Sequence, residues 1–345
     1  MSSPSSQLVL VSGTTGFVGS EVTLHFLRAG FRVRGTVRSQ DKADKWEAKH
    51  GNFDGRLEWA IVKDISEAGA FDEAIKGVSL VAHTASPFHY DVKDNEKDML
   101  IPALEGTRQI LRAAQKEASV KRVVVTSSFA AVLDMKNGLG PDTTYDHTMW
   151  NPATYDEAKN AVKGQEAFIY CASKKVAEEE AWKIAKEPET KWKLTTICPP
   201  LVMGPPVQVL ESLDSLNTSS GAVWGIVDKK EVPETSFPVW VDVRDIAKLH
   251  VEAVTKDEAA GERFLCIAGH YSSEMIADVA RKAFPDQASR IPEPAADKVT
   301  DNADQHFKTD SSHVEKVLGI KWISFEQSVK DTLAEIFKVE KQLKQ

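Results

Sequence analysis

The chain has 345 residues, of which 42% are hydrophobic and 27% are charged, the composition of a soluble globular protein with an extensive core. Its 43 basic and 51 acidic residues give a net charge of −8, which argues against a general nucleic-acid or anionic-membrane surface but leaves room for a small basic pocket that binds one phosphate. The three cysteines, Cys171, Cys198 and Cys266, are isolated in the sequence, which favours free thiols in a reducing compartment. The chain does not start like a signal peptide and has no apolar run long enough to span a bilayer, so we expect a cytoplasmic protein.

The first part of the chain alternates short apolar runs with helical patterns. After residues 1–6, which we expect to form a loose, disordered tail, the run LVLVSG predicts a strand that ends in a glycine turn. Residues 17–29 follow a helical pattern with Val18 and Phe26 on one stripe, and Gly30 is placed to end the helix. The next apolar run, FRVRGTVR, predicts the second strand.

Further apolar runs each turn polar or proline-rich at their carboxyl ends: LEWAIVKDI, LVAHTAS, RVVVTSS and KLTTICPP. Helical stretches separate them, such as residues 101–118 and 167–186. Continuous apolar strands that alternate with helices predict a parallel sheet covered on both faces. Because ligands of such sheets bind beyond the carboxyl ends of the strands, we expect Asp64, residues 83–86 and residues 126–128 to lie in one neighbourhood.

The second part of the chain is less regular. Residues 134–165 are polar and predict a long surface excursion, and the end of the chain predicts closing helices. We expect a doubly wound α/β domain over residues 7–198, to which residues 239–271 return, and a smaller substrate-binding lobe over residues 199–238 and 272–345.

Gly13, Gly16 and Gly19 follow the first predicted strand in the order GTTGFVG. The usual dinucleotide fingerprint is G-x-G-x-x-G between a strand and a helix, where glycine lets the backbone approach a pyrophosphate and the helix N-terminus offers unpaired N–H groups. The spacing here, G-x-x-G-x-x-G, is a variant of that fingerprint. A tight turn without a ligand could also use glycines, but the place at the first strand–helix junction favours dinucleotide binding.

The end of the second predicted strand, GTVRSQDK, bears on which dinucleotide binds. NAD sites usually place an acid there to bond the ribose hydroxyls. This strand has no acid at its tip, since Asp41 lies beyond it, whereas Arg38 and Lys42 could hold the 2′-phosphate of NADP. Both could instead be solvated loop charges, so the missing acid is the stronger half of the argument.

Asp64 stands at the end of the third predicted strand. Its carboxylate could accept a hydrogen bond from an adenine amino group, or it could simply cap the helix that follows. The spacing alone leaves both interpretations open.

In the segment AFIYCASKKVAEEEAW, Tyr170 and Lys174 lie one helical turn apart. They begin a stripe of otherwise small and apolar residues, which is the kind that packs inward, whereas the glutamates at 178–180 lie mostly on other faces. An inward lysine needs partners for its three donors; ribose hydroxyls and the tyrosine would supply them, and its charge would lower the tyrosine pKa toward that of a useful acid. The alternative is a lysine that extends from the start of the helix into water.

Ser127 and Ser128 in RVVVTSS stand at the carboxyl end of a buried strand, on the ligand side of the predicted sheet. A hydroxyl there can hold a carbonyl oxygen while Tyr170 protonates it. Serines also end strands without a catalytic role, and we expect that of at least one of this pair.

The motifs GTTGFVG, TSS and YCASK, in this order and spacing, resemble the extended short-chain dehydrogenase/reductase superfamily over essentially the full length of the chain. The segments TVRSQDKA, HTASPF, VKRVVVTSSFAAV, WNPATY and VWVDVRDIAKLHV are similar to its fungal carbonyl reductases, in the branch near the dihydroflavonol reductases. The resemblance implies a Rossmann domain, NADPH (NADP+ when oxidised) as the cofactor, and a catalytic triad of Ser128, Tyr170 and Lys174. Besides Tyr170 and Lys174, the cofactor contacts that it implies are Gly13, Thr14, Thr15, Gly16, Phe17, Val18, Gly19, Arg38, Lys42, Asp64, Ile65, Thr84, Val202 and Ser219. It also implies a substrate pocket formed by Phe88, Ser128, Tyr170 and the loop after Val202.

Two segments depart from this family's pattern. Residues 198–200 read CPP where the family often has N-P-x, and residues 207–225 are of a type that varies among these enzymes. Both departures leave the substrate open without changing the predicted chemistry.

The predicted function is NADPH-dependent reduction of a ketone or aldehyde by hydride transfer, in a monomer or homodimer that acts on a small molecule and binds neither nucleic acid nor membrane. One alternative is an NAD-dependent nucleotide-sugar epimerase or dehydratase on the same scaffold, but dehydratases tend to place acids just after the strand-tip serine, where this chain has Phe129, Ala130 and Ala131. Another is a non-catalytic NADPH-binding protein, a class that typically loses the tyrosine or the lysine. The nine histidines show no metal-binding spacing and the serine-hydrolase motif G-x-S-x-G is absent, so we expect neither a metal nor serine hydrolysis.

Overall fold

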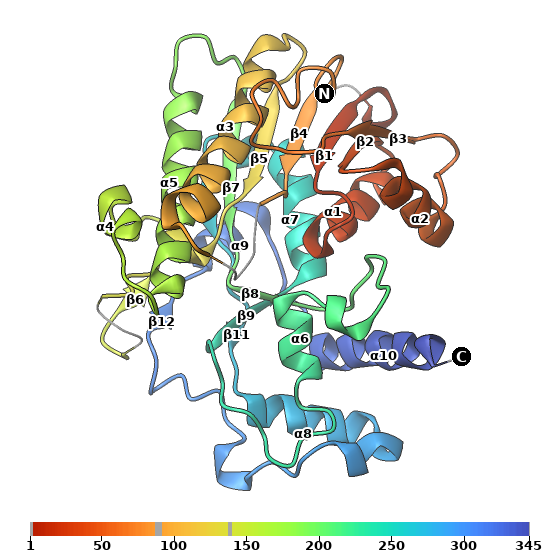
Figure 1. The fold of residues 1–345 in the computed structure, drawn as a ribbon, viewed down its shortest axis with the longest axis vertical. Helices are drawn as coiled ribbons and strands as arrows, with labels where there is room; N and C mark the ends of the chain where they lie inside the picture. Colours follow the sequence, from red (N-terminus) through yellow and green to blue (C-terminus); the bar gives the residue numbers. More distant parts are fainter. Residues whose placement is uncertain (1–2, 87–91, 137–139, 345) are drawn as a thin grey trace.

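A seven-stranded parallel sheet lies at the centre of the computed structural model, which describes residues 3–86, 92–136 and 140–344 (Figure 1). Its strands, in the order in which they lie side by side, are β10 (Arg263–Leu265), β7 (Lys193–Cys198), β5 (Arg122–Thr126), β4 (Leu80–His83), β1 (Leu8–Ser12), β2 (Arg32–Val37) and β3 (Leu57–Ile61). Every neighbouring pair is parallel. The direction of the strand order reverses between β1 and β4, and the predicted doubly wound sheet is confirmed. A ligand is therefore expected in the crevice beyond the carboxyl ends of these two strands.

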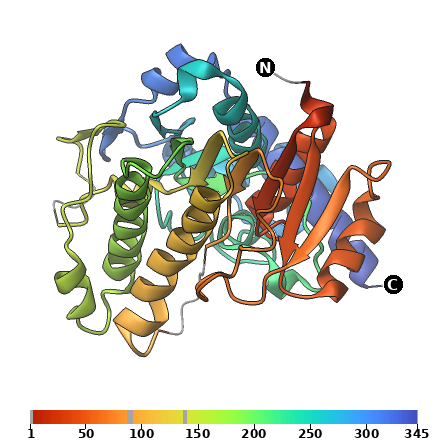
Figure 2. The same cartoon turned by 90° about the horizontal axis from the view of Figure 1, so that it is seen from above.

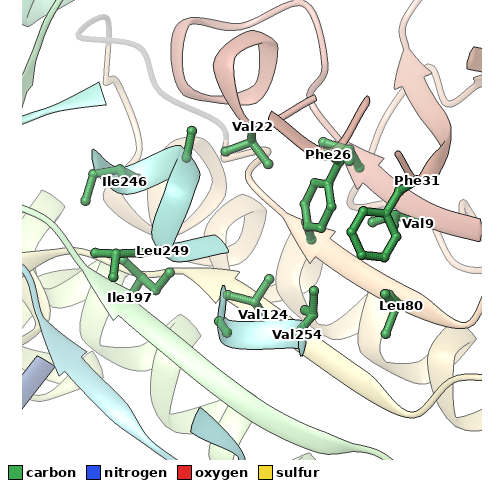
Figure 3. Close-up of a cluster of buried hydrophobic side chains, with 14 of the residues drawn as sticks. Val9, Val22, Phe26, Phe31, Leu80, Val124, Ile197, Ile246, Leu249 and Val254 are labelled. Atoms are coloured by element: carbon green, nitrogen blue, oxygen red, sulfur yellow. The ribbon is translucent and has the colours of Figure 1, made fainter. Parts of the chain in front are cut away.

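Helices cover both faces of this sheet, as Figures 1 and 2 show. The helices that share a core with the strands on one face are α1 (Phe17–Arg28), α2 (Gln40–His50), α7 (Val243–Thr255) and α9 (Ser312–Leu318). On the other face the helices are α3 (Ile101–Lys116) and α5 (Glu166–Ala185), which lie side by side (Figure 2). Figure 3 shows part of the first core, with Phe26 of α1 and Ile246 of α7 among its residues, together with Val124 and Ile197 of the sheet. Because both faces are buried, the strands carry the continuous apolar runs that predict them.

A smaller lobe lies below the large sheet in the view of Figure 1. Its three-stranded sheet has β9 (Val239–Asp242) in the middle, between β8 (Leu201–Met203) and β11 (Gly269–His270). Three helices complete a separate core, and α10 (Phe325–Leu343) contacts both α6 (Thr218–Trp224) and α8 (Ser273–Ala283). Within the described ranges, α10 included, no helix has the length and apolar character needed to cross a membrane.

Residues 239–271, predicted to return to the larger lobe, are in fact divided between the two lobes. The helix α7 and strand β10 join the large sheet and its covering layer, whereas β9 and β11 pair in the small sheet. The physical reason lies in β9, which is buried along its whole length: Trp240 packs in the core of the smaller lobe and Val241 in that of the larger lobe. The predicted boundary therefore runs beside a strand that serves both lobes.

The described parts of two segments without predicted elements contain short regular structure. Within the excursion over residues 134–165, Tyr145 is 1% exposed and packs between Phe129 and Phe307. Within the tail, Pro4 begins one exposed 3-10 turn, because its fixed φ suits the first position of a helix. The remaining short elements are η1 (Pro4–Ser6), η2 (Asn95–Leu100), η3 (Phe129–Ala131), β6 (Thr144–Tyr145), α4 (Tyr155–Lys159), η4 (Leu213–Ser215), η5 (Asp257–Ala259), η6 (Pro285–Arg290), η7 (Ala296–Lys298) and β12 (Lys308–Thr309).

Candidate active site

The glycine turn joins β1 to α1 and brings the chain close to the end of β4. Gly13 has a φ of +69°, which glycine adopts without strain, and a Cβ atom there would lie 3.0 Å from the Cα atom of Ala85. A Cβ atom on Gly19 would lie only 2.1 Å from the carbonyl oxygen of Gly13. Both positions therefore require glycine, and the turn is tighter than any side chain would allow.

The first turn of α1, residues 17–19, points unpaired backbone N–H groups toward this glycine turn. The N-cap residue is Gly16, which has no side chain that could accept their hydrogen bonds. Thr14 is buried and donates to the carbonyl oxygen of Val11 at 3.0 Å, while Thr15 is half-buried. A helix N-terminus without a side-chain cap, next to a backbone that a ligand can approach closely, suits a pyrophosphate.

Hydrogen bonds join the ends of β1 and β4 beside the turn. The hydroxyl oxygen of Ser12 accepts hydrogen bonds from the N–H groups of Thr84 and Ala85, each at 3.1 Å, so its own proton is directed to Nδ1 of His83, 2.8 Å away. The Thr84 hydroxyl in turn donates to the carbonyl oxygen of Ser12 at 2.5 Å. Burial, together with the charge of Lys174, lowers the pKa of His83 to about 3, so this ring is neutral. Thr84 thus lies where β1 and β4 end, and its contact with the cofactor stays a prediction. Within the described ranges no cluster of three or more metal-ligating side chains is found.

Arg38 and Lys42 lie beyond the carboxyl end of β2. Arg38 directly follows the strand, Lys42 lies in the first turn of α2, and both side chains are exposed. The nearby Asp41 pairs with Lys45 at 3.0 Å, one helical turn further on. The strand tip therefore presents two cations at the edge of the sheet where the crevice opens, and its nearest acid is engaged with a lysine of the same helix.

Asp64 has a clear structural role at the end of β3. One of its carboxylate oxygens accepts hydrogen bonds from the N–H and the hydroxyl of Ser66, at 2.8 and 2.6 Å, and these bonds lower the pKa of Asp64. The residues that follow form turns, so Asp64 caps a turn and not the helix considered in the sequence analysis. Ile65 is half-buried against the second core. A contact of either residue with adenine stays a prediction.

The helix α5 carries Tyr170 and Lys174 on the face that packs inward. Ala177 and Ala181 on this face are buried, and the side chain of Lys174 is half-buried. The Lys174 ammonium donates to the hydroxyl of Ser86 and lies 5.5 Å from the centre of the Tyr170 ring. Burial lowers the pKa of Lys174 to about 8. The lysine is thus directed to the end of β4 and not along the helix surface into water.

Ser127 and Ser128 follow β5 and are used differently. Ser127 is buried, and its hydroxyl donates to the carboxylate of Glu178 at 2.6 Å. Ser128 is half-buried and caps the short helix η3, since its hydroxyl oxygen accepts from the N–H of Ala130 at 3.1 Å. Because α5 packs against η3, Ser128 lies beside the helix that carries Tyr170. Ser127 is therefore the member of the pair with an internal role, and a contact of Ser128 with a substrate stays a prediction.

Val202 and Ser219 meet in the smaller lobe. Ser219 lies buried in the first turn of α6 and donates its hydroxyl proton to the carbonyl oxygen of Val202 in β8. The structure thus brings these two predicted residues to each other, and their contact with the cofactor stays a prediction. Phe88, the predicted pocket residue, lies outside the described residues.

A buried ion pair that the sequence analysis misses lies behind the strand tips. Glu178, one of the glutamates assigned to outer faces of α5, is 1% exposed and pairs with Arg263 of β10 at 2.7 Å. The signal that could have revealed it is the arginine itself, which stands in the apolar strand RFL, where a buried cation needs a buried acid.

The geometry as a whole fits a dinucleotide and proton transfer. The glycine cradle of Gly13 and Gly19 leaves the backbone open to a pyrophosphate, and the cations after β2 could bind a further phosphate. Tyr170 supplies a phenol beside a cation, and Ser128 supplies a hydroxyl at the neighbouring strand tip. Such a set can bind a nicotinamide dinucleotide and protonate a carbonyl oxygen.

Comparisons with known proteins show the family to which the chain belongs. The sequence profile of the 3-beta hydroxysteroid dehydrogenase/isomerase family matches residues 10–269. The NADPH-dependent methylglyoxal reductase GRE2 of Saccharomyces cerevisiae is 34% identical over 96% of this chain and 98% of its own length. The ketoreductase azaE of Aspergillus niger is 36% identical over 94% of this chain and 96% of its own length. The crystal structure of yeast methylglyoxal/isovaleraldehyde reductase Gre2 complexed with NADPH has a TM-score of 0.88 at 33% identity, covering 97% of this chain and 100% of that chain.

Proposed function

The chain belongs to the 3-beta hydroxysteroid dehydrogenase/isomerase family, and we propose that it is an NADPH-dependent carbonyl reductase that converts ketones and aldehydes to alcohols. The predicted relationship to reductases of the yeast type is confirmed by identity that extends over nearly the whole chain. One observation carries the proposal: the inward-facing Lys174 lies beside the Tyr170 ring and reaches the end of β4, at the edge of the sheet where the glycine turn opens.

Three side chains act on the carbonyl group, and each has a different function. The cofactor, when bound, supplies a hydride to the carbonyl carbon. The Tyr170 hydroxyl donates a proton to the carbonyl oxygen, and the positive charge of Lys174 stabilises the phenolate that remains. The Ser128 hydroxyl donates a hydrogen bond to the same carbonyl oxygen and holds it in line with the phenol.

The choice of NADPH is supported by the charges beyond β2. Arg38 and Lys42 are exposed there, and a guanidinium forms paired hydrogen bonds with phosphate oxygens. The yeast relative GRE2 is described as NADPH-dependent and its crystal structure is a complex with NADPH, and we extend that cofactor to this chain. The residues that would hold the pyrophosphate are those of the glycine turn and the first turn of α1.

Tyr170→Phe tests the assignment of the acid. We expect kcat to fall by about 10²-fold or more, because general acid catalysis contributes at least that factor, while the Kd for NADPH stays within about threefold of the wild-type value. Tyr155→Phe is the matched control, since Tyr155, at the start of the short helix α4, donates its hydroxyl to Glu96 of η2 at 3.0 Å, and the loss of this bond should leave kcat unchanged. Substantial turnover by Tyr170→Phe would remove Tyr170 from the mechanism.

The substrate class is proposed from the names of the relatives. They reduce methylglyoxal or isovaleraldehyde or are described as ketoreductases, so we propose small aldehydes and ketones as substrates. The test follows NADPH and NADH oxidation with small aldehydes, diketones and bulky aryl ketones. NADPH oxidation with at least one of these compounds is expected; tightly bound NAD in the purified protein, with no turnover of any carbonyl, would contradict the proposal.

We further propose that the enzyme acts in the cytoplasm, as a monomer or a homodimer. Its three cysteines are free and buried, which is typical of proteins from a reducing compartment. Fractionation of cells and light scattering of the purified enzyme test the two statements.

A further inference from the structure

Glu178 connects the helix of the proposed acid to the strand tips opposite it. It lies one helical turn after Lys174 and two after Tyr170 on α5. One carboxylate oxygen accepts hydrogen bonds from the Ser127 hydroxyl at 2.6 Å and Nη2 of Arg263 at 3.1 Å. The other accepts from Nε of Arg263 at 2.7 Å and the Thr196 hydroxyl at 2.8 Å. A single side chain of α5 thus holds groups from β5, β7 and β10.

Arg263 extends this network to the far side of Ser128. Its Nη2 donates to the carbonyl oxygen of Ala131 at 3.4 Å, at the end of the short helix that Ser128 caps. Its Nη1 donates to the carbonyl oxygens of His147 and Met149 at 2.9 and 2.6 Å. The Glu178–Arg263 pair therefore fixes the chain both before Ser128, through Ser127, and after it, through Ala131.

A small cavity lies beside the contact between α5 and the strand tips. Ser86, Ser127, Lys174 and Glu178 line one small cavity between the helix and the strand ends. Across this space the Ser127–Glu178 hydrogen bond is a direct connection between the two elements. The length of this hydrogen bond therefore affects the distance between Ser128 and the side chains of α5.

The ionised carboxylate of Glu178 is better suited to fixing the positions of the groups around it than to stabilising the fold. Burial acts to raise the pKa of Glu178, but the hydrogen bond and charge of Arg263, with the hydroxyls of Ser127 and Thr196, outweigh it and lower the pKa. Buried ion pairs contribute little stability compared with apolar side chains of the same volume, because both charges lose their water. What such a pair provides here is defined geometry between three strands and one helix.

We propose that Glu178 is a positioning residue that, through Ser127 and Arg263, sets the distance between the Ser128 hydroxyl and the Tyr170 phenol. The inference rests on the proposed function, since that distance matters when both groups bind one carbonyl oxygen. Glu178 itself touches neither substrate nor cofactor in this assignment.

Ser127→Ala tests the proposal with little risk to the fold, and Thr196→Val is its matched control. Both variants remove one hydroxyl donor from the same carboxylate, but only Ser127 adjoins Ser128. We expect kcat with the best carbonyl substrate to fall about tenfold in Ser127→Ala, because even a small misplacement of reacting groups lowers the rate strongly. In Thr196→Val, kcat should stay within about twofold of the wild-type value. The KM for NADPH should stay unchanged in both, and Ser127→Thr, which keeps a hydroxyl, should restore kcat.

The outcomes separate this inference from the proposed function. If Ser127→Ala and Thr196→Val lower kcat by the same factor, or if neither does, the positioning role is wrong while carbonyl reduction stands. If Ser127→Thr fails to restore kcat although its melting temperature matches the wild type, the hydroxyl is not the connection and the proposal is also wrong. If none of the carbonyl compounds supports NADPH oxidation by the wild-type enzyme, the proposed function fails, and the inference fails with it.

Discussion

Lys174 has an environment unlike that of a surface lysine. Its side chain is half-buried, its ammonium donates to Ser86, and burial lowers its pKa to about 8. The charged form therefore predominates below pH 8 in the free enzyme and the neutral form above it. In the proposed mechanism only the charged form stabilises the Tyr170 phenolate, so the protonation of Lys174 limits activity on the alkaline side.

The pH dependence of the reaction measures this directly. We expect kcat/KM for NADPH to be constant below pH 8 and to fall about tenfold per pH unit above it, because kcat/KM reports groups of the free enzyme. Lys174→Arg is the control. Its guanidinium stays charged, so kcat/KM for NADPH should no longer fall between pH 8 and pH 10, even if its absolute value is low. A wild-type profile that stays flat to pH 10 would contradict the role of Lys174.

We expect Arg38 to set the preference for NADPH over NADH in the proposed site. Arg38→Leu should raise the KM for NADPH about tenfold or more and leave the KM for NADH unchanged, because a charged hydrogen bond to the 2′-phosphate is lost. Arg32→Leu is the charge-matched control, since Arg32 is exposed at the opposite end of β2. Equal effects of the two variants on NADPH would mean that only the net charge of the surface matters.

Individual residues differ in how well the sequence predicts them. The spacing of Tyr170 and Lys174 predicts that they share one face, because a helix places residues four apart on the same side. It leaves open whether Lys174 extends into water, and the structure shows that face turned inward. Glu178 was missed because an acid within a run of glutamates has the pattern of a solvated helix face. Its buried partner Arg263 lies 85 residues further along the chain, so the sequence does not reveal that the two meet.

The turn between β1 and α1 is the element that would hold the pyrophosphate in the proposed site. A methyl group on Gly19 would lie 2.1 Å from the carbonyl oxygen of Gly13, so this carbonyl or the helix has to move. Movement of either one displaces the N–H groups that suit the pyrophosphate. The turn is therefore intolerant of even the smallest side chain at this position.

Gly19→Ala should lower the free energy of unfolding by about 3 kcal/mol, the cost of overpacking a tight site, and should abolish NADPH binding. Gly221→Ala is the control, because a Cβ atom there meets nothing within 4 Å and alanine favours a helix such as α6 by about 1 kcal/mol. Urea unfolding and fluorescence titration with NADPH measure the two effects. If both variants unfold at the same urea concentration, the contact with Gly13 is not restrictive.

Elements of the large sheet are predicted well because parallel strands buried on both faces form continuous apolar runs between amphipathic helices. The strand β9 is predicted to belong to the larger lobe, whereas it pairs in the small sheet, and the reason is related. All four of its side chains are buried, so the sequence carries no polar face to show that Trp240 and Val241 pack in different cores. The sequence also does not predict the strand β6, because β6 forms only by pairing with β12, which lies far along the chain.

At the scale of the whole molecule, Asp245 makes stability depend on pH. It lies on α7, is 4% exposed, and accepts a hydrogen bond from the N–H of Ile323 at 2.9 Å, which joins the helix to the segment before α10. Burial, with the charge of Asp242, raises its pKa from 3.8 to about 6, although the hydrogen bond from Ile323 and the charges of Arg244 and Lys248 oppose the change. The folded state therefore binds the proton more tightly than the unfolded state. The stabilisation is complete below about pH 4 and is lost as the pH rises through 6.

Asp245→Asn removes this titration while its amide oxygen can still accept from Ile323. The two proteins should have similar free energies of unfolding near pH 4, and the variant should become more stable by up to about 3 kcal/mol near pH 7. Urea unfolding at several pH values between 4 and 7.5 measures the difference. Asp286→Asn, at an exposed site, shows the effect of losing one surface charge. A difference between Asp245→Asn and the wild type that does not change with pH would exclude Asp245 as its source.

The late return of the chain to the large sheet has a consequence for synthesis on the ribosome. The strand β10 covers the edge of β7, and α7 covers apolar residues such as Val124 and Ile197, yet both elements follow the first strands of the smaller lobe in the sequence. A nascent chain that ends before α7 therefore exposes an open strand edge and an uncovered apolar face, which invite pairing with other chains. We expect chains stalled there to be held by chaperones and chains stalled well beyond β10 to be released. The stage most prone to aggregation is thus the unfinished polypeptide, not the mature enzyme.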